Sequence, residues 1–107
     1  MKIADFDNLI AANHLILIDF YASWCGACGA IDPMLDRIAF SMGDIVTIVR
    51  IDTTSPSSFD IVNRYNIVAV PTLILFRRSI PLWRESGIVA FNRLHDIVRY
   101  HHSIVAY

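Results

Sequence analysis

The sequence predicts a single α/β domain in which a central sheet carries helices on both of its faces. Three observations lead to this fold class. Segments with a helical spacing of apolar residues alternate with short, continuous apolar runs of strand length. The order of these segments, α-β-α-β-α-β-β-α, is typical of a sheet covered by helices. The length of 107 residues fits one domain and leaves no room for a second, so we expect residues 1–107 to form one domain.

The first half of the chain contains two expected helices and two expected strands. Apolar and polar residues alternate with helical spacing over residues 5–13, and residues 15–21 form a continuous apolar run, as in a strand covered on both faces. Apolar positions then step by three and four over residues 26–42, which predicts a helix that Pro33 kinks. Residues 45–51 are rich in β-branched side chains and predict the second strand.

The second half contains two more expected helices. Ser55 followed by Pro56 is a typical helix start, with a capping side chain and a proline at the first helical position. This helix is expected to run to about residue 65, where Asn66 can adopt the left-handed conformation that ends many helices. The last helix is expected over residues 91–107, with its apolar side chains on one face.

Between these two helices the sequence predicts a hairpin. Residues 67–76 predict a strand that is entered through Pro71, and residues 77–79 predict the turn after it. Residues 81–85 begin with a proline, which fits only an edge strand because proline cannot donate a ladder hydrogen bond. Gly87 then interrupts the chain before the last helix.

The composition excludes several classes of protein. Hydrophobic residues make up 55% of the chain, which excludes a disordered protein. The longest apolar run, residues 67–76, is about half of the roughly 20 residues that cross a membrane. No apolar signal segment follows Met1, so we expect a cytoplasmic protein without a membrane association; the mature form of an extracytoplasmic protein is the alternative that this sequence leaves open. Six arginines lie in residues 61–107, but only Arg77 and Arg78 are adjacent, which favours solvated surfaces over nucleic-acid binding.

The two cysteines carry the clearest chemical signal. They stand in Trp24-Cys25-Gly26-Ala27-Cys28, where the first predicted strand turns into a helix. Backbone N–H groups at the start of a helix stabilise an anion, so the thiolate of Cys25 is favoured. Cys28 lies one turn further along and can attack a mixed disulfide that Cys25 forms. Two thiols at this spacing can exchange two electrons with another disulfide.

A pair of cysteines also has less specific interpretations. It can be half of a zinc site, but such a site needs two further ligands, and none of the four histidines has the spacing of a ligand pair. We therefore expect no metal. The cysteines can also be inert, in a module that binds a partner and turns over little.

Two features outside the cysteine motif point to the same chemistry. Asp19 lies inside a strand that is expected to be buried on both faces, so its pKa should be raised. It can accept the proton that Cys28 must lose, or it can be a hydrogen-bonded aspartate with a structural role only. Pro71, in Val70-Pro71-Thr72, interrupts an apolar strand, which favours a cis peptide bond there.

Together these features resemble the thioredoxin family over nearly the whole chain. The resemblance rests on the order of the elements and on the following segments: Ile18-Asp19-Phe20-Tyr21-Ala22-Ser23-Trp24-Cys25-Gly26-Ala27-Cys28, Pro33, Val70-Pro71-Thr72 and Gly87. It implies the thioredoxin fold, with a central mixed sheet flanked by helices on both faces. It also implies a thiol–disulfide oxidoreductase that acts on disulfide-containing proteins without a cofactor of its own. A flavin-dependent thioredoxin reductase would be its electron donor.

The resemblance assigns roles to single positions. Cys25 would be the exposed nucleophile and Cys28 the buried resolving cysteine, and the two would form the redox disulfide. Asp19 would be the buried acid, and Gly26 and Ala27 would complete the active-site loop.

A second group of positions would bind the substrate. Pro71 would be a cis-proline packed against the disulfide, between Val70, whose backbone would pair with the substrate chain, and Thr72. Trp24 and Gly87 would flank the substrate groove.

Several positions depart from the family pattern. Ala27 replaces the usual proline between the cysteines, and we expect a somewhat more oxidising potential. Gly29 replaces the usual basic residue. The lysine that commonly neighbours the buried aspartate falls at Ile48, so we expect Asp19 to lose its cation and its pKa to be higher still.

The N-terminal edge strand of the family is expected to be missing or vestigial, because only residues 1–4 precede the first helix. Residues 45–51 would then form an exposed apolar edge, and such edges pair with another chain or are covered. We expect either a homodimer through residues 45–51 or a cover formed by residues 1–4.

Overall fold

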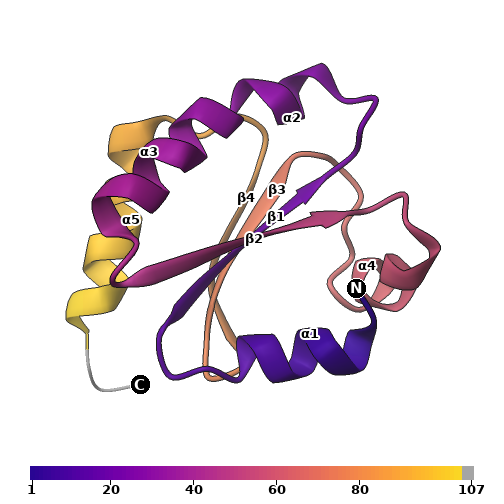
Figure 1. Ribbon diagram of the computed structural model, residues 1–107, viewed down its shortest axis with the longest axis horizontal. Helices are drawn as coiled ribbons and strands as arrows, with labels where there is room; N and C mark the ends of the chain where they lie inside the picture. The colour runs from indigo at the N-terminus through magenta and orange to yellow at the C-terminus, as the bar shows by residue number, and fades with distance from the viewer. Residues whose placement is uncertain (105–107) are drawn as a thin grey trace.

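A mixed sheet of four strands forms the centre of the molecule in the computed structural model, which describes residues 1–104. Its strands are β1 (Leu15–Tyr21), β2 (Val46–Asp52), β3 (Thr72–Arg77) and β4 (Ile80–Ser86). They lie in the order β2-β1-β3-β4, with β1 parallel to β2 and β3 antiparallel to both β1 and β4. The helices lie on either side of this sheet (Figure 1).

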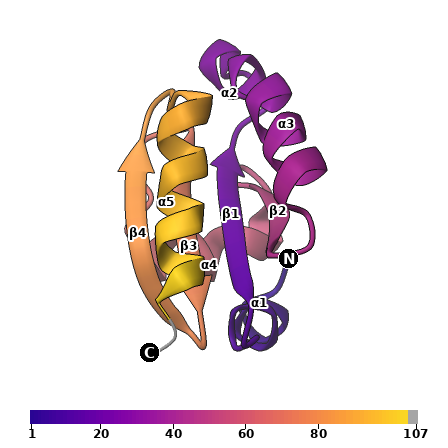
Figure 2. The same ribbon diagram turned by 90° about the vertical axis from the view of Figure 1, so that its left-hand side faces the viewer.

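The helices form two layers, one on each face of the sheet. Their bounds are α1 (Ile3–Ile10), α2 (Gly26–Ala30), α3 (Asp32–Met42), α4 (Phe59–Arg64) and α5 (Phe91–Ser103), with a short 3-10 helix η1 (Pro56–Ser58) before α4. Helices α3 and α5 pack on one face, and α1 and α4 on the other (Figures 1 and 2). None of the helices within residues 1–104 combines the length and the apolar character that a membrane crossing requires.

Strand β1 is buried on both faces, as its continuous apolar run predicts. Leu15 and Leu17 pack in the cluster that includes side chains of α3 and α5, whereas Ile16 and Ile18 pack in the cluster that includes side chains of α1 and α4. Because side chains alternate along a strand, Asp19 lies on the same face as Leu15 and Leu17, toward α3 and α5.

The order of elements agrees with the predicted order, and the turns have the expected chemistry. Asn66 follows the end of α4 with a positive φ of 51°. A two-residue turn joins β3 to β4, where Arg78 and Ser79 have φ of 51° and 65°. Positive φ at both positions is typical of a tight hairpin turn whose twist matches that of its strands. Pro81 lies in β4, at the edge of the sheet, as expected.

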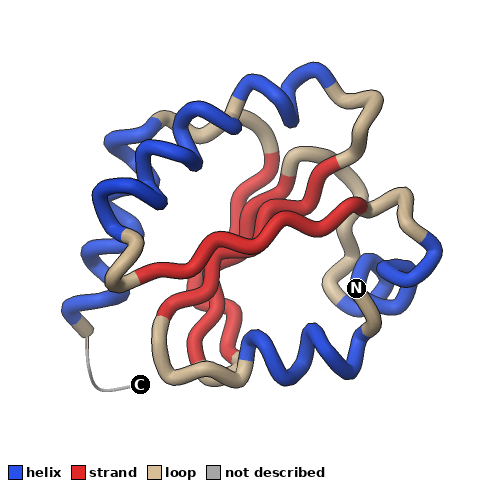
Figure 3. The backbone as a smooth tube through the Cα atoms, in the orientation of Figure 1, coloured by secondary structure: helices blue, strands red, loops and turns tan. Residues whose placement is uncertain are grey.

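The expected kinked helix over residues 26–42 is instead two helices (Figure 3). Helix α2 ends and α3 begins at Ile31, which has φ −89° and ψ −9°. Pro33 lies in the first turn of α3, where its missing N–H costs no helical hydrogen bond. The proline therefore starts a new helix rather than bending a continuous one.

The expected strand over residues 67–76 begins only at Thr72, so its first half is wrong. Residues 67–70 form a loop whose first N–H, that of Ile67, donates to the carbonyl of Val62 at 3.0 Å. Pro71 has no N–H to continue a ladder into this segment.

The expected capping of a helix by the Ser55 side chain is not found. Ser55 does not cap the following helix through its side chain, and its Oγ lies 3.1 Å from Oγ of Ser57.

The ends of the chain also differ in part from expectation. Helix α1 already begins at Ile3, and the amino group of Met1 donates to Ser57 Oγ at 2.9 Å, so residues 1–4 do not cover β2. No strand precedes α1 in the part of the chain that is described, as expected, and β2 lies at the edge of the sheet. The last helix ends at Ser103, and residue 107, its predicted end, lies outside the described residues.

Candidate active site

Cys25 and Cys28 form a disulfide at the start of α2. Their Cα atoms are 5.3 Å apart, within the usual range for such a bond. The turn after β1 is closed by the N–H of Cys25, which donates to the carbonyl of Ala22 at 3.1 Å. Cys25 is partly exposed, whereas Cys28 is 4% exposed. The pair therefore presents one accessible sulfur and one protected sulfur.

The backbone of α2 is arranged to support a negative charge on Cys25. Cys25 has an extended conformation and is the N-terminal capping residue of α2, and the N–H of Cys28 donates to its Sγ at 3.1 Å. When the disulfide is reduced, a donor in this position favours the thiolate over the thiol. The predicted nucleophile thus has a local partner that stabilises its reactive form.

The loop before β3 lies against the disulfide. The carbonyl oxygen of Val70 is 3.6 Å from Sγ of Cys25, and the Val70–Pro71 peptide bond is cis. The carbonyl of Pro71 accepts from the N–H of Gly87 at 2.8 Å. Thr72 Oγ1 donates to the carbonyl of Ala69 at 2.6 Å. The structure therefore places Val70 beside the first cysteine and connects Pro71, Thr72 and Gly87 through the same loop.

Apolar side chains are exposed around this loop. Trp24 is 75% exposed, and it lines a pocket with loop residues that include Val68, which is 82% exposed. Ile88, directly after Gly87, is also exposed. Exposed apolar side chains of this size beside a reactive sulfur can form a docking surface for a peptide chain.

The three glycines at or near this site have different structural requirements. Gly87 has a φ of +93°, a conformation that side chains with a Cβ rarely adopt. A Cβ added at Gly26 or Gly29 would meet no atom within 4 Å, and neither has a positive φ. Of these three positions, only 87 therefore has a backbone conformation that favours glycine. Ala27, between the cysteines, is exposed.

Asp19 on β1 is buried, with 1% of its surface exposed. Within the described residues neither of its carboxylate oxygens has a hydrogen-bond partner, although Nε of Arg50 lies 3.6 Å from Oδ2. Burial raises the pKa of Asp19 from 3.8 to about 6, the charge of Arg50 opposes this shift, and the charge of Asp32 adds to it. The pKa of Asp19 is thus raised, which is the direction expected from the sequence.

The expected loss of a cation beside Asp19 is wrong. Ile48 does stand opposite Leu17, and it packs against the apolar cluster on the α3 and α5 side. However, Arg50 stands directly opposite Asp19 in the parallel pairing of β2 with β1, and it forms an ion pair with it. Arg50 is not evident from the sequence, because the register between two strands decides which side chains meet, and no single segment encodes that register.

A pocket of about 370 Å³ adjoins the disulfide. Its lining residues come from the end of β1, from α2 and α3, and from β2: Tyr21, Ala22, Ser23, Cys25, Cys28, Gly29, Asp32 and Arg50. Both sulfur-bearing residues thus share one pocket with a carboxylate and a guanidinium. Among residues 1–104, no three His, Cys, Asp or Glu side chains gather in a way that could hold a metal ion.

Comparisons with known proteins agree with this geometry. The family model described as Thioredoxin matches residues 1–99. A chloroplastic thioredoxin Y from Oryza sativa subsp. japonica is 39% identical over 92 residues, which cover 85% of this chain and 54% of the relative. A thioredoxin from Mycolicibacterium smegmatis is 32% identical over 80 residues, which cover 75% of this chain and 71% of the relative.

The chain spans about half the length of the plant relatives that it matches. Among solved structures, the thioredoxin of Malassezia sympodialis has a TM-score of 0.83 to this chain. The match covers 95% of this chain and 87% of the other, at 24% sequence identity, and so supports the fold alone.

Proposed function

Because this chain belongs to the thioredoxin family, we propose that it is a thiol–disulfide oxidoreductase in which Cys25 and Cys28 alternate between a dithiol and a disulfide. We assign this activity to one thioredoxin-like domain over residues 1–107. The observation that carries it is the Cys25–Cys28 disulfide at the start of α2, next to a backbone carbonyl of the Val70 loop. No metal or organic cofactor is needed for this exchange.

In the first step the Cys25 thiolate attacks one sulfur of a substrate disulfide. A mixed disulfide forms between Cys25 and that sulfur, and the other substrate sulfur leaves as a thiolate that takes up a proton. The partial exposure of Cys25 and the amide donor on its Sγ support its role as the attacking group.

In the second step Cys28 attacks Sγ of Cys25. The intramolecular disulfide forms, the mixed disulfide breaks, and the second substrate sulfur leaves as a thiol. Two electrons have then passed from the protein dithiol to the substrate. Cys28 must lose its proton to react, and we propose that the buried Asp19 accepts it. A pKa of about 6 suits this task, because Asp19 is largely ionised at neutral pH and still a useful base.

We propose that the substrate is an extended segment of a disulfide-containing protein. Its backbone would pair with Val70 next to Pro71, and Trp24, Thr72 and Gly87 would border it. The short distance between the Val70 carbonyl and Cys25 Sγ supports this placement, because a chain bound at Val70 would present its sulfur to Cys25.

The oxidised protein needs a dithiol donor to return to its starting state. We propose that a thioredoxin reductase supplies the two electrons, and that the protein acts in electron transport for cell redox homeostasis in the cytoplasm. The low cysteine content, with one catalytic pair, is typical of proteins from a reducing compartment.

We also propose that a second copy of the chain pairs with β2. Within residues 1–104 this strand has β1 as its only neighbour in the sheet, so its outer edge is open. An open edge with β-branched residues such as Ile48 and Val49 is a template for another strand.

The activity is tested by reduction of insulin with dithiothreitol as the electron source. The wild-type protein should accelerate the reaction, and Cys25→Ser should abolish the acceleration while the fold is retained. If the wild-type protein and Cys25→Ser are equally inactive but bind the same partners, the chain is a redox-poor binding module. Stoichiometric zinc or iron in the purified protein would favour metal binding through the two cysteines.

A further inference from the structure

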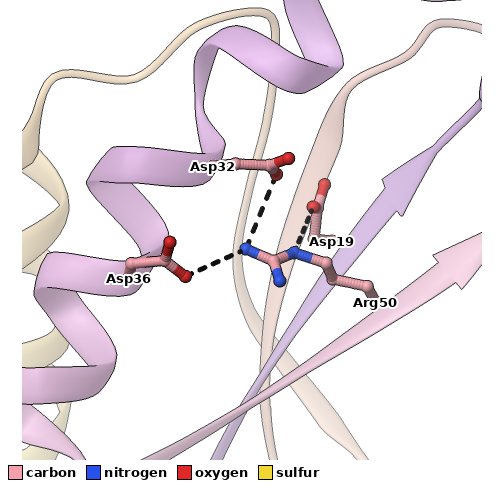
Figure 4. A network of polar contacts seen from close by, with 4 residues as sticks. All are labelled: Asp19, Asp32, Asp36 and Arg50. Atoms are coloured by element: carbon pink, nitrogen blue, oxygen red, sulfur yellow. Dashed lines mark ion pairs between the residues drawn. The ribbon is translucent and has the colours of Figure 1, made fainter.

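Arg50 is the centre of an ion network that joins three elements (Figure 4). From β2, its Nε lies 3.6 Å from Oδ2 of Asp19 on β1. Its Nη2 lies 3.5 Å from Oδ1 of Asp32 and 3.5 Å from Oδ1 of Asp36, both on α3. One guanidinium thus faces three carboxylates.

The fold places these four side chains together. Arg50 is the direct partner of Asp19 in the register of β2 with β1, so the two side chains point to the same face of the sheet. Helix α3 packs on that face, and Asp32 and Asp36 are one helical turn apart, so both reach the guanidinium from one side of α3. The rigid pairing of two strands therefore fixes the contact between Arg50 and Asp19.

The network reaches the disulfide through the pocket beside it. Arg50 and Asp32 line this pocket together with Cys25 and Cys28. The Arg50 side chain is 41% exposed, whereas that of Asp19 is 1% exposed. Arg50 thus extends from the buried carboxylate to the pocket that both cysteines line.

The carboxylate of Asp19 depends strongly on this neighbour. Among the described residues it has no hydrogen-bond donor, and an ionised carboxylate in an apolar strand is costly without a partner. Arg50 is the cation that forms an ion pair with it. Asp32 and Asp36 compete for the same guanidinium, and the negative charge of Asp32 opposes ionisation of Asp19.

Other charged groups on this face are further along the sheet or paired elsewhere. Glu85 of β4 lies in the same cross-strand row, beyond Leu73 of β3, and it forms an ion pair with Arg93 of α5 at 2.6 Å. From α2, the Cys28 sulfur is in the disulfide. The charged surroundings of the Asp19 carboxylate are therefore one cation from β2 and two carboxylates from α3.

We propose that Arg50 is a positioning residue for the exchange reaction: it lines the pocket together with Cys25 and Cys28 and holds the carboxylate of its buried partner Asp19 ionised and oriented, while Asp32 and Asp36 hold the guanidinium. Arg50 then supplies, from a different position on the strand, the cation that Ile48 does not provide. This inference rests on the proposed function, because the orientation of Asp19 matters for catalysis only if Cys28 must be deprotonated.

The direct test is the titration of Asp19 in the oxidised protein of residues 1–107, followed by NMR of its side-chain carboxyl carbon. Arg50→Gln should raise the pKa of Asp19 from about 6 to about 7 or higher, because an opposite charge at this distance lowers a carboxyl pKa by roughly 1–3 units. Arg50→Lys keeps the charge without the planar fork and should give an intermediate pKa. Arg99→Gln removes an exposed positive charge on α5 and should leave the titration unchanged.

A second variant acts with the opposite sign. Asp32→Asn removes a negative charge near Asp19 and releases the guanidinium toward it, so the pKa of Asp19 should fall. This variant keeps the inference testable if Arg50→Gln does not fold. Any one of three results would overturn the inference. These are an unchanged pKa of Asp19 in folded Arg50→Gln, a pKa of Asp19 in Arg50→Lys equal to that in Arg50→Gln, and an unchanged or raised pKa of Asp19 in Asp32→Asn.

A kinetic readout connects the network to the reaction. The rate at which Cys28 releases a substrate from the mixed disulfide should rise with pH along the ionisation of Asp19. Its midpoint should move to higher pH in Arg50→Gln and to lower pH in Asp32→Asn. A pH profile that does not move in either variant overturns the inference, whereas a wild-type protein that reduces no disulfide overturns the proposed function, whatever the Asp19 titration shows.

Discussion

The backbone N–H of Cys28 donates to Sγ of Cys25 at 3.1 Å, so the sulfur of the first cysteine caps the helix that carries the second. The two sulfurs consequently differ in environment. Cys25 is partly exposed and lies 3.6 Å from the carbonyl of Val70, whereas Cys28 is 4% exposed. This asymmetry gives the two thiols different tasks in the proposed reaction and can be tested by removing one sulfur at a time.

Cys28→Ser is expected to trap the mixed disulfide with a protein substrate. Cys25 can still attack, but no second sulfur is present to release the product. Mass spectrometry of the intact protein after incubation with insulin should show a one-to-one adduct on Cys25. Cys25→Ser serves as the matched control and should form little adduct, because the remaining Cys28 is 4% exposed. Equal adduct formation by the two variants would contradict the assignment of the nucleophile.

Asp19→Asn is expected to gain stability relative to the wild-type protein as the pH rises. The pKa of Asp19 is 3.8 when unfolded and about 6 when folded, so between these values the folded state binds more protons than the unfolded state. The free energy of unfolding of the wild-type protein therefore falls as the pH rises from 3.8 to about 6. Asp19→Asn does not show this decrease, because asparagine does not ionise. The difference between the two should grow by about 3 kcal/mol from pH 3.5 to pH 8.

Urea denaturation across this pH range measures the effect. Asp60→Asn is the control, because Asp60 is exposed on α4, and its difference from wild type should not grow in the same way. A constant difference for Asp19→Asn, or one that shrinks as the pH rises, would show that the carboxyl is not costly when it is ionised.

Gly87→Ala is expected to destabilise the fold through the backbone alone. Gly87 has a φ of +93°, and a Cβ there would meet no atom within 4 Å, so the cost is conformational and should be about 1–2 kcal/mol. Gly29→Ala is the matched control: its site is equally open, its φ is not positive, and it lies within α2. That substitution should be neutral or stabilise the protein by up to about 1 kcal/mol. Equal effects in chemical denaturation would contradict this distinction.

The sequence allowed most of the sheet and the cysteine motif to be predicted, because both depend on local patterns. The bounds of β1 follow from a continuous apolar run, and the position of Cys25 at the start of a helix follows from the change of periodicity after that run. Asp19 could be identified because a carboxylate is conspicuous inside such a run.

The parts that were not predicted depend on contacts between segments far apart in the sequence. The ion pair of Arg50 with Asp19 follows from the register of two strands, which no single segment encodes. Residues 67–70 have the composition of a strand but pair with no strand among residues 1–104, so they form the loop that carries Val70 to Cys25. In this molecule the local pattern supplies the reactive groups, and the tertiary register supplies their electrostatic environment.

The open edge of β2 predicts a concentration-dependent dimer with a charge-dependent affinity. Antiparallel pairing of two copies about a twofold axis at Thr47 would place the exposed Thr47 directly opposite Thr47 of the second copy, on the same face of the joined sheet. Thr47→Glu and Thr47→Lys should then each weaken the dimer by about threefold to tenfold, because each substitution places two like charges opposite one another across the new pair of strands. Asn92→Lys adds the same charge on exposed α5 and should have no effect in sedimentation velocity. A strictly monomeric profile for all variants, with rapid amide exchange along residues 45–51, would exclude this dimer, because strand pairing must protect the outward-facing amides of β2.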